Sequence, residues 1–137
     1  MGMVYTEITL KNAVDVGEAQ RGVIKEDAIR QVTVTALVDT GASDLVIDEA
    51  TRAQLGLSIE KRSMVTLADG SQEEYQVTEP VKIHWKDRDA VSYALVLPHA
   101  DEVLLGALPL EAMDLMIHPK LQGLVGVHGD KARYVVY

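Results

Sequence analysis

One short stretch of the chain places groups that could do chemistry directly after an apolar strand. The stretch "ALVDTGAS" covers residues 36–43, and the carboxylate of Asp39 comes where the strand should still be buried. A buried, unpaired carboxylate costs several kcal/mol unless hydrogen bonds or a neighbouring charge compensate for it. Thr40 and Gly41 follow at once. An acid in so unfavourable a place suggests a chemical purpose.

Carboxylates at such a place could act as general base and general acid in a hydrolysis. Such a reaction needs a base that takes a proton from water and an acid that protonates the group under attack. Two close carboxylates that share one proton can do both, whereas one carboxylate cannot. Their mutual repulsion raises one apparent pKa, and the pair titrates as a unit.

The elements around Asp39 are predicted to be short strands. Residues 3–10 alternate apolar and polar, as a half-buried strand does, and residues 11–30 are polar with two glycines, which indicates a loop or an irregular hairpin. Residues 30–38 predict a long strand that ends at Asp39. One of its faces carries Val32, Val34, Ala36 and Val38, and the other carries Thr33, Thr35 and Leu37.

The rest of the chain continues this pattern of strands and turns. Asp48 as N-cap and Gly56 at the end predict a short helix within residues 48–57. Asp69-Gly70 predicts a tight turn between two β-prone arms in residues 63–77. Further predicted elements are strands at 44–47, 79–85, 90–97 and 131–137, an apolar strand near 103–105 and a helical patch from about Pro109 to Leu115. The chain therefore reads as mostly β and barrel-like.

Three motifs occur in an order that is typical of one protein family. They are the loop "LVDTGAS", the hairpin "VTLADGSQEEYQV" and the strand and helix "LLGALPLEAM". In this order, from about Thr33 to Ile117, the sequence resembles the retroviral-type (retropepsin-like) aspartic proteases. The resemblance implies an all-β, acid-protease (retropepsin-like) closed barrel with one or two short helices, formed as a single domain over residues 1–137.

The resemblance also implies a function. The chain would be an aspartic endopeptidase that activates water between two carboxylates, without a cofactor or a metal. Because it carries a single Asp-Thr-Gly and is too short for a second lobe, the two carboxylates would come from the two Asp39 residues of a symmetric homodimer. The expected partners are a polypeptide substrate and a second copy of the chain.

The resemblance assigns roles to nine residues. Asp39 would be catalytic, and the active-site loop would continue through Thr40, Gly41 and Ala42. Ala68, Asp69 and Gly70 would form the tip of the flap, a hairpin that closes over substrate. Leu105 and Gly106 would lie beside the site as structural residues.

Two positions depart from the retroviral pattern. Ser43 stands where many retroviral enzymes carry Asp, and Ala107 follows the second glycine where they usually carry Arg. The ion pair that those enzymes place behind the site is therefore absent from this pattern. The sequence from His118 onward resembles the family only loosely.

Composition and charge argue against several other functions. The net charge of −8 and the lack of a basic stripe argue against nucleic acid as a partner. The chain has no cysteine, and its four histidines lack the spacing of metal ligands. No stretch is apolar for long enough to predict a membrane span, so a cytoplasmic location is expected. The serines do not occur in a Gly-x-Ser-x-Gly motif, which argues against a serine hydrolase.

Less specific interpretations of the same residues remain open at this point. Asp39 could cap a strand end, Asp69-Gly70 could be an ordinary exposed turn, and Leu104 to Gly106 could be a plain core strand and turn. At the level of function, the alternative is a catalytically silent retropepsin-like module that dimerises or binds peptides.

Ala42 yields a testable hypothesis about pH. Family members with Ser at this place can donate a hydrogen bond to the catalytic carboxylate, which stabilises its charged form, and Ala42 cannot. We therefore expect the pair of acids to titrate higher than in a Ser-type relative, with activity at mildly acidic pH. A pH–rate profile that peaks below about pH 3 would contradict this expectation.

Overall fold

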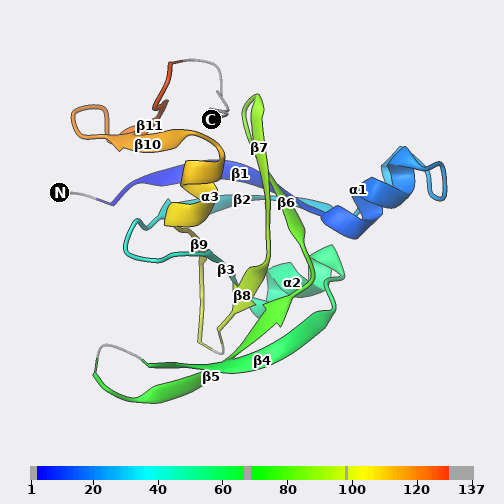
Figure 1. Cartoon of the computed structure of the whole chain (residues 1–137), viewed down its shortest axis with the longest axis horizontal. Coiled ribbons are helices and arrows are strands. Elements are labelled where there is room, and N and C mark those ends of the chain that lie inside the picture. Colours follow the sequence, from blue (N-terminus) through cyan, green and yellow to red (C-terminus); the bar gives the residue numbers. More distant parts are fainter. Residues whose placement is uncertain (1–2, 67–68, 98, 130–137) are drawn as a thin grey trace, which may run out of the picture.

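The computed structural model of the chain describes residues 3–66, 69–97 and 99–129, and most of its elements are strands (Figure 1). In chain order, the strands are β1 (Tyr5–Asn12), β2 (Gln31–Val38), β3 (Leu45–Ile47), β4 (Ile59–Thr66), β5 (Gln72–Thr78), β6 (Val81–Trp85), β7 (Arg88–Ser92), β8 (Ala94–Val96), β9 (Val103–Leu105), β10 (Leu115–His118) and β11 (Gly123–Gly126). The helices are α1 (Ala13–Gln20), α2 (Glu49–Leu55), α3 (Ala107–Ala112) and the 3-10 helix η1 (Glu26–Ala28). None of these described helices is long and apolar enough to cross a membrane.

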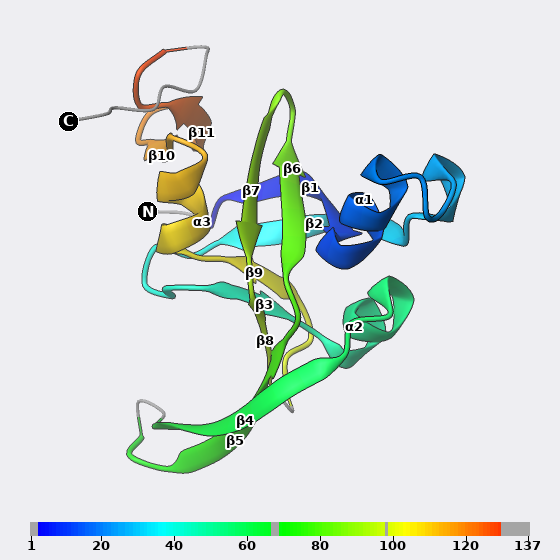
Figure 2. The ribbon, with the colours of Figure 1, turned by 45° about the vertical axis from the view of Figure 1, so that its right-hand side comes forward.

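Among the described residues, nine strands form one open sheet. Its order is β4-β5-β8-β3-β9-β2-β1-β6-β7, and β10 pairs with β11 in a separate ribbon. The predicted closed barrel is therefore wrong, because β4 and β7 are edges and no pairing joins them within the described residues. The β4–β5 hairpin joins the sheet only through two residue pairs between β5 and β8, and it projects away from the body (Figure 2).

Strand β2 lies inside the sheet and delivers Asp39 to its middle. The strand pairs with β1 on one side and with β9 on the other. Its alternation follows the prediction, since Ala36 and Val38 are buried while Thr33 and Thr35 are exposed. The last residues of β2 therefore lie between β1 and β9, and these two strands restrict the conformation of the backbone that leads into Asp39.

The prediction of a loop over residues 11–30 missed helix α1. Asn12 caps this helix, because its side-chain oxygen accepts a hydrogen bond from Asp15 N at 3.1 Å, and its side-chain amide donates to Leu55 O at 2.9 Å. Asp15 forms an ion pair with Arg30 at 2.8 Å, and this bonded guanidinium holds the pKa of Asp15 below its usual range. Tertiary contacts stabilise the helix despite Gly17 in its interior.

Helix α2 follows its sequence signals closely. The side chain of Asp48 accepts a hydrogen bond from Thr51 N at 2.9 Å, as expected of an N-cap. Gly56 ends the helix with φ of 61°, a left-handed conformation that favours glycine. The helix predicted within residues 48–57 is confirmed.

Helix α3 begins and ends earlier than the predicted patch from Pro109 to Leu115. It covers Ala107–Ala112, and Asp114 then takes a left-handed φ of 58°, so Leu115 already opens β10. The buried guanidinium of Arg88 holds this turn by donating to the carbonyl oxygens of Met113 at 3.0 Å and Asp114 at 2.8 Å. The same group donates to Gly129 O at 2.6 Å, which ties the end of the described chain to β7.

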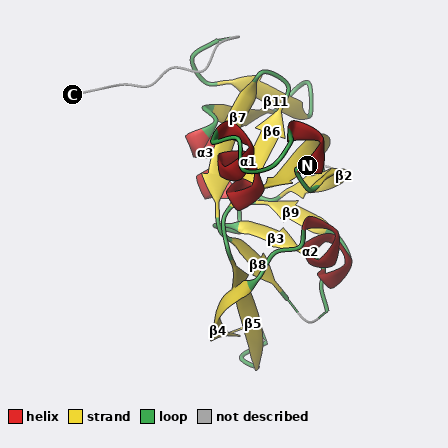
Figure 3. Ribbon diagram, turned by 90° about the vertical axis from the view of Figure 1, so that its right-hand side faces the viewer, coloured by secondary structure: helices red, strands yellow, loops and turns green. Residues whose placement is uncertain are grey.

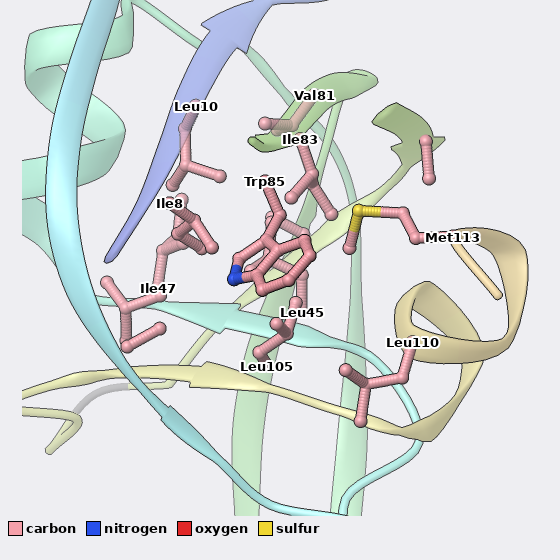
Figure 4. Close-up of a cluster of buried hydrophobic side chains, with 14 of the residues drawn as sticks. Ile8, Leu10, Leu45, Ile47, Val81, Ile83, Trp85, Leu105, Leu110 and Met113 are labelled. Atoms are coloured by element: carbon pink, nitrogen blue, oxygen red, sulfur yellow. The ribbon is translucent and has the colours of Figure 1, made fainter. Parts of the chain in front are cut away.

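The core is built from aliphatic side chains around one indole (Figure 4). Trp85 is 8% exposed, and its Nε1 donates a hydrogen bond to Thr6 Oγ1 at 2.8 Å. Leu45 and Leu105, which belong to the strands beside Asp39, are completely buried in this core. The burial of these two strands anchors the segments that position the acid.

Candidate active site

Asp39 is the first residue after β2, and its backbone is held by β9. Its N–H donates to Leu105 O at 3.0 Å, which continues the parallel pairing of β2 with β9 by one residue. The side chain is half-buried rather than fully buried, which differs from the expectation raised by the sequence. A half-buried acid keeps access to solvent and to a ligand.

The backbone that follows turns back on Asp39; we call the segment from Asp39 to Asp44 the Asp39 loop. Ala42 N donates to Asp39 O at 3.1 Å, and Gly41 N donates to the carboxylate oxygen Oδ1 of Asp39 at 3.0 Å. A Cβ on Gly41 would lie 3.2 Å from that oxygen. The loop therefore sets the orientation of the carboxylate with its own backbone.

Thr40 lies exposed at the tip of the Asp39 loop. Its hydroxyl forms no hydrogen bond within the part of the chain that the structure describes. Its predicted place in the active-site loop, next to Asp39, stays a prediction as far as function is concerned.

The first residues of helix α3 hold the Asp39 loop in place with two backbone hydrogen bonds. Ala107 N donates to Ala42 O at 2.8 Å, and Leu108 N donates to Ser43 O at 2.9 Å. Gly106 lies so close to the loop that an added Cβ would be 2.3 Å from Asp44 O. The structure thus places Leu105 and Gly106 beside the loop, where the resemblance put them.

A mostly apolar hollow of about 290 Å³, here the Asp39 hollow, opens beside the acid. Met3 and Val4 line it from the N-terminal segment, and Ile117, Pro119 and Gln122 line it from the C-terminal part. Asp39 is the only acidic residue among the described residues that line it. Sequence reasoning missed the C-terminal contribution, because nothing in the pattern after His118 marked it as close to Asp39.

The chemistry available to one such site is limited by its single carboxylate. Asp44 is the next acid along the loop, and its Oδ2 already accepts a hydrogen bond from Ser43 Oγ at 2.6 Å. A lone carboxylate can take a proton or give one, but general acid–base cleavage needs both at once. One chain by itself therefore offers a single oriented carboxylate at this site.

The β4–β5 hairpin carries the second set of predicted residues. The described residues of the two strands pair from Ile59 with Thr78 to Thr66 with Gln72, on either side of the predicted turn at Asp69-Gly70. Ala68 lies outside the described residues. The hairpin extends from the sheet at the end away from α1 (Figure 3).

Asp69 and Gly70 shape the described part of the hairpin turn. Gly70 has φ of 87°, which a residue with a side chain rarely adopts. The Oδ1 of Asp69 accepts hydrogen bonds from Ser71 Oγ at 2.5 Å and from Ser71 N at 2.9 Å. These bonds, chiefly the one from the hydroxyl, hold the pKa of Asp69 below its usual range, so it stays charged at mildly acidic pH.

A second hollow, of about 240 Å³, lies where the hairpin meets the sheet. Val46 and Leu104 line it from β3 and β9, but Glu73, Asp101 and Glu102 line it as well. The lining is part apolar and part acidic. The loop before β9 brings Asp101 and Glu102 close to β5, the hairpin strand that carries Glu73.

No metal centre is evident in the described residues, which contain no group of three or more His, Cys, Asp and Glu placed to hold a metal ion. Two of the four histidines instead lie close to a carboxylate. His128 is bonded to Asp114 at 2.6 Å, and His99 lies 3.5 Å from Glu73.

Comparisons with known proteins agree on one family and one fold. A family model described as "gag-polyprotein putative aspartyl protease" matches residues 25–112. This match contains the Asp39 loop, the β4–β5 hairpin and Gly106. No curated protein sequence matches the chain significantly.

Two solved structures illustrate the shared fold. The EIAV protease in complex with the inhibitor HBY-793 is 19% identical, with a TM-score of 0.55 over 80% of this chain and 86% of the protease. The retroviral protease-like domain of Ddi1 from Leishmania major is 18% identical, with a TM-score of 0.55 over 91% of this chain and 88% of the domain. At these identities the likeness shows a retropepsin-like fold.

Gly106→Ala tests whether close packing holds the Asp39 loop. Its Cβ would meet Asp44 O, Asp44 N and Ala42 O at 2.3, 2.7 and 2.8 Å, all backbone atoms that cannot turn aside. We expect the free energy of unfolding, measured by urea denaturation, to fall by about 1–3 kcal/mol.

Gly17→Ala is the matched control, because an added Cβ there meets nothing within 4 Å and the position is inside helix α1. We expect it to stabilise the protein by about 0.5–1 kcal/mol. Equal effects of the two substitutions would show that the Asp39 loop does not depend on the close approach of Gly106.

Proposed function

The chain belongs to the gag-polyprotein aspartyl protease family, and from this premise we propose that it is an aspartic endopeptidase. The observation that carries the proposal is the placement of Asp39. The acid follows a buried strand, its carboxylate is oriented by Gly41 N, and it borders an open hollow. A carboxylate held in this way can act on a bound water molecule without first reorganising its surroundings.

The proposed active site has two Asp39 carboxylates, one from each copy of the chain. The pair holds one proton and a water molecule between its oxygens. The charged carboxylate takes a proton from the water as it attacks the peptide carbonyl carbon, and the protonated one donates to the carbonyl oxygen. In the resulting diol, the carboxylate that is now charged takes a proton from a hydroxyl while the one that is now protonated donates to the nitrogen. The C–N bond breaks, the pair again holds one proton, and no covalent enzyme intermediate is needed.

The homodimer is proposed to form on the side of the chain where the Asp39 hollow opens. Met3, which lines this hollow, is 71% exposed, and the segment that forms the β10–β11 ribbon carries Met116 at 45% and Leu121 at 70% exposed. The N-terminal segment and the β10–β11 ribbon that carry them lie on the same side of the molecule (Figure 1). A symmetric interface here would cover these side chains and bring the two acids together.

The substrate is proposed to be an extended polypeptide between the two subunits. The β4–β5 hairpin would act as the flap, with substrate backbone paired to its residues near Asp69 and Gly70 in the manner of an added strand. Within the described residues the hairpin pairs with the rest of the sheet through two residue pairs, which supports a flap that opens and closes over a ligand.

A second candidate is a retropepsin-like module that dimerises or binds peptides without cleaving them. Each chain supplies a single carboxylate, Asp39. If two copies never bring their Asp39 side chains together, this alternative is favoured. An intact Asp-Thr-Gly, with its backbone hydrogen bonds in place, favours the enzyme.

Asp39→Asn separates the two candidates. An unstructured polypeptide is incubated between about pH 4 and 7 with the wild type and with the variant, and the fragments are measured by mass spectrometry. We expect the wild type to cleave and the variant to lose at least about a hundredfold in rate, because an amide can neither take nor share the proton.

Asp87→Asn serves as the control, since Asp87 is an exposed acid in the turn between β6 and β7. It should cleave as the wild type does. Binding of the polypeptide without cleavage by either protein would instead support the silent module.

Leu121→Asp tests the proposed dimer face. A charge placed at the centre of an apolar interface loses its hydration on association, so we expect the dimer dissociation constant to rise about tenfold or more. Analytical ultracentrifugation measures the constant, and the activity per chain should fall at low protein concentration and recover at high concentration.

Val23→Asp is the matched control, because Val23 is 69% exposed against 70% for Leu121 but lies in the loop after α1. It should leave association unchanged. A protein that stays monomeric at every concentration at which it cleaves would contradict the two-chain site.

A further inference from the structure

A third hollow, of about 400 Å³, lies far from Asp39 and has no part in the proposed proteolysis. We call it the lysine hollow, because Lys11 of β1 and Lys82 of β6 line it, together with His84 of β6. Helix α1 and the segment around η1 form its other wall, with Val16, Ala19 and Ile29 among the lining residues. Lys11 is six residues along β1 from Tyr5, which pairs with the Asp39 end of β2, a separation of about 20 Å.

The two lysines face each other directly. Lys11 and Lys82 are paired in the antiparallel register of β1 and β6, so their side chains leave the sheet on the same face. Both residues are half-buried. Like charges directly opposite each other on neighbouring strands are destabilising, and partial burial reduces the screening by water.

The acids nearby compensate this repulsion only in part. Lys82 Nζ lies 3.7 Å from Asp89 Oδ2 on β7, and Lys11 forms no ion pair with any described residue. Glu26 lines the hollow from η1 but lies beyond ion-pair distance of either lysine. In a chain with a net charge of −8, an unneutralised cation in a concave site is unusual.

His84 adds an unpaired polar group to the same face. It lies two residues along β6 from Lys82, and its Nε2 is buried without a hydrogen-bond partner among the described residues. Burial, with repulsion from Lys11 and Lys82, holds the pKa of His84 below its usual range, while Asp89 opposes this shift. His84 Nε2 is therefore a buried polar atom without a hydrogen-bond partner among the described residues, which lowers the stability of the free protein.

We propose that the lysine hollow is a binding site for a small organic oxyanion. The negatively charged head would lie between Lys11 and Lys82, beside His84, where it removes the repulsion of the lysines and favours the charged form of the imidazole. The compact apolar part would pack against Val16, Ala19 and Ile29. A single inorganic ion would fill little of the volume, which lies in the usual range for small-molecule sites.

The first test measures binding directly at His84. Sodium phosphate, and separately sodium citrate, is titrated against sodium chloride at matched ionic strength while the ring resonances of His84 are followed by NMR. We expect a saturable shift of these resonances and a rise in the pKa of His84, because a bound anion favours the charged imidazolium. The stronger of the two probes identifies the head group as phosphate or carboxylate.

The second test uses Lys11→Gln, with Lys61→Gln as the control. Lys61 is exposed on β4 and lies outside the hollow. We expect Lys11→Gln to weaken binding of the stronger probe about tenfold or more, and Lys61→Gln to change it less than about twofold.

Stability in chloride gives an independent readout. Without an anion, Lys11→Gln should unfold at the same temperature as the wild type or higher, because it removes a like-charge contact. With the anion at saturation the order should reverse, since only the wild type gains the full binding energy. A His84 signal that fails to saturate with both probes, or equal weakening by the two substitutions, would overturn the proposed site.

Discussion

The structure depends on the close approach of Gly106 to the backbone of the Asp39 loop. Strand β9 pairs in parallel with β2 and antiparallel with β3, so it joins the segments before and after the loop. Since Gly106 has no side chain, the start of α3 comes near enough to donate two hydrogen bonds to loop carbonyls. These contacts leave the carboxylate of Asp39 little freedom, which is the condition for a precisely directed acid or base.

Rigidity at this junction contrasts with the parts that surround it. The buried leucines of β3 and β9 anchor the site to the core, whereas the β4–β5 hairpin is attached through two residue pairs. The N-terminal segment and the part of the chain from Ile117 to Gln122 line the hollow beside Asp39, and both segments carry exposed apolar residues. This division is what the proposed two-chain protease would require, with one group held in place by the core and a hairpin attached by few contacts.

Charge is distributed unevenly over the same framework. Three acids line the hollow near the hairpin, while two lysines face each other at the far end of β1. Sequences selected for stability alone would not be expected to keep an opposed pair of like charges beside an unpaired histidine. Such arrangements are common where a protein binds a ligand that neutralises them.

The sequence by itself determined the local features. The alternation of β2, the caps of α2, and the order of the Asp-Thr-Gly, hairpin and Leu-Leu-Gly motifs follow from short-range preferences, which a linear pattern records. Helix α1 escaped prediction because its cap, Asn12, also bonds to Leu55, a contact between distant segments. The open sheet, the residues from the C-terminal part beside Asp39 and the opposed lysines were decided by tertiary structure alone, since strand order and register depend on which distant strands pair.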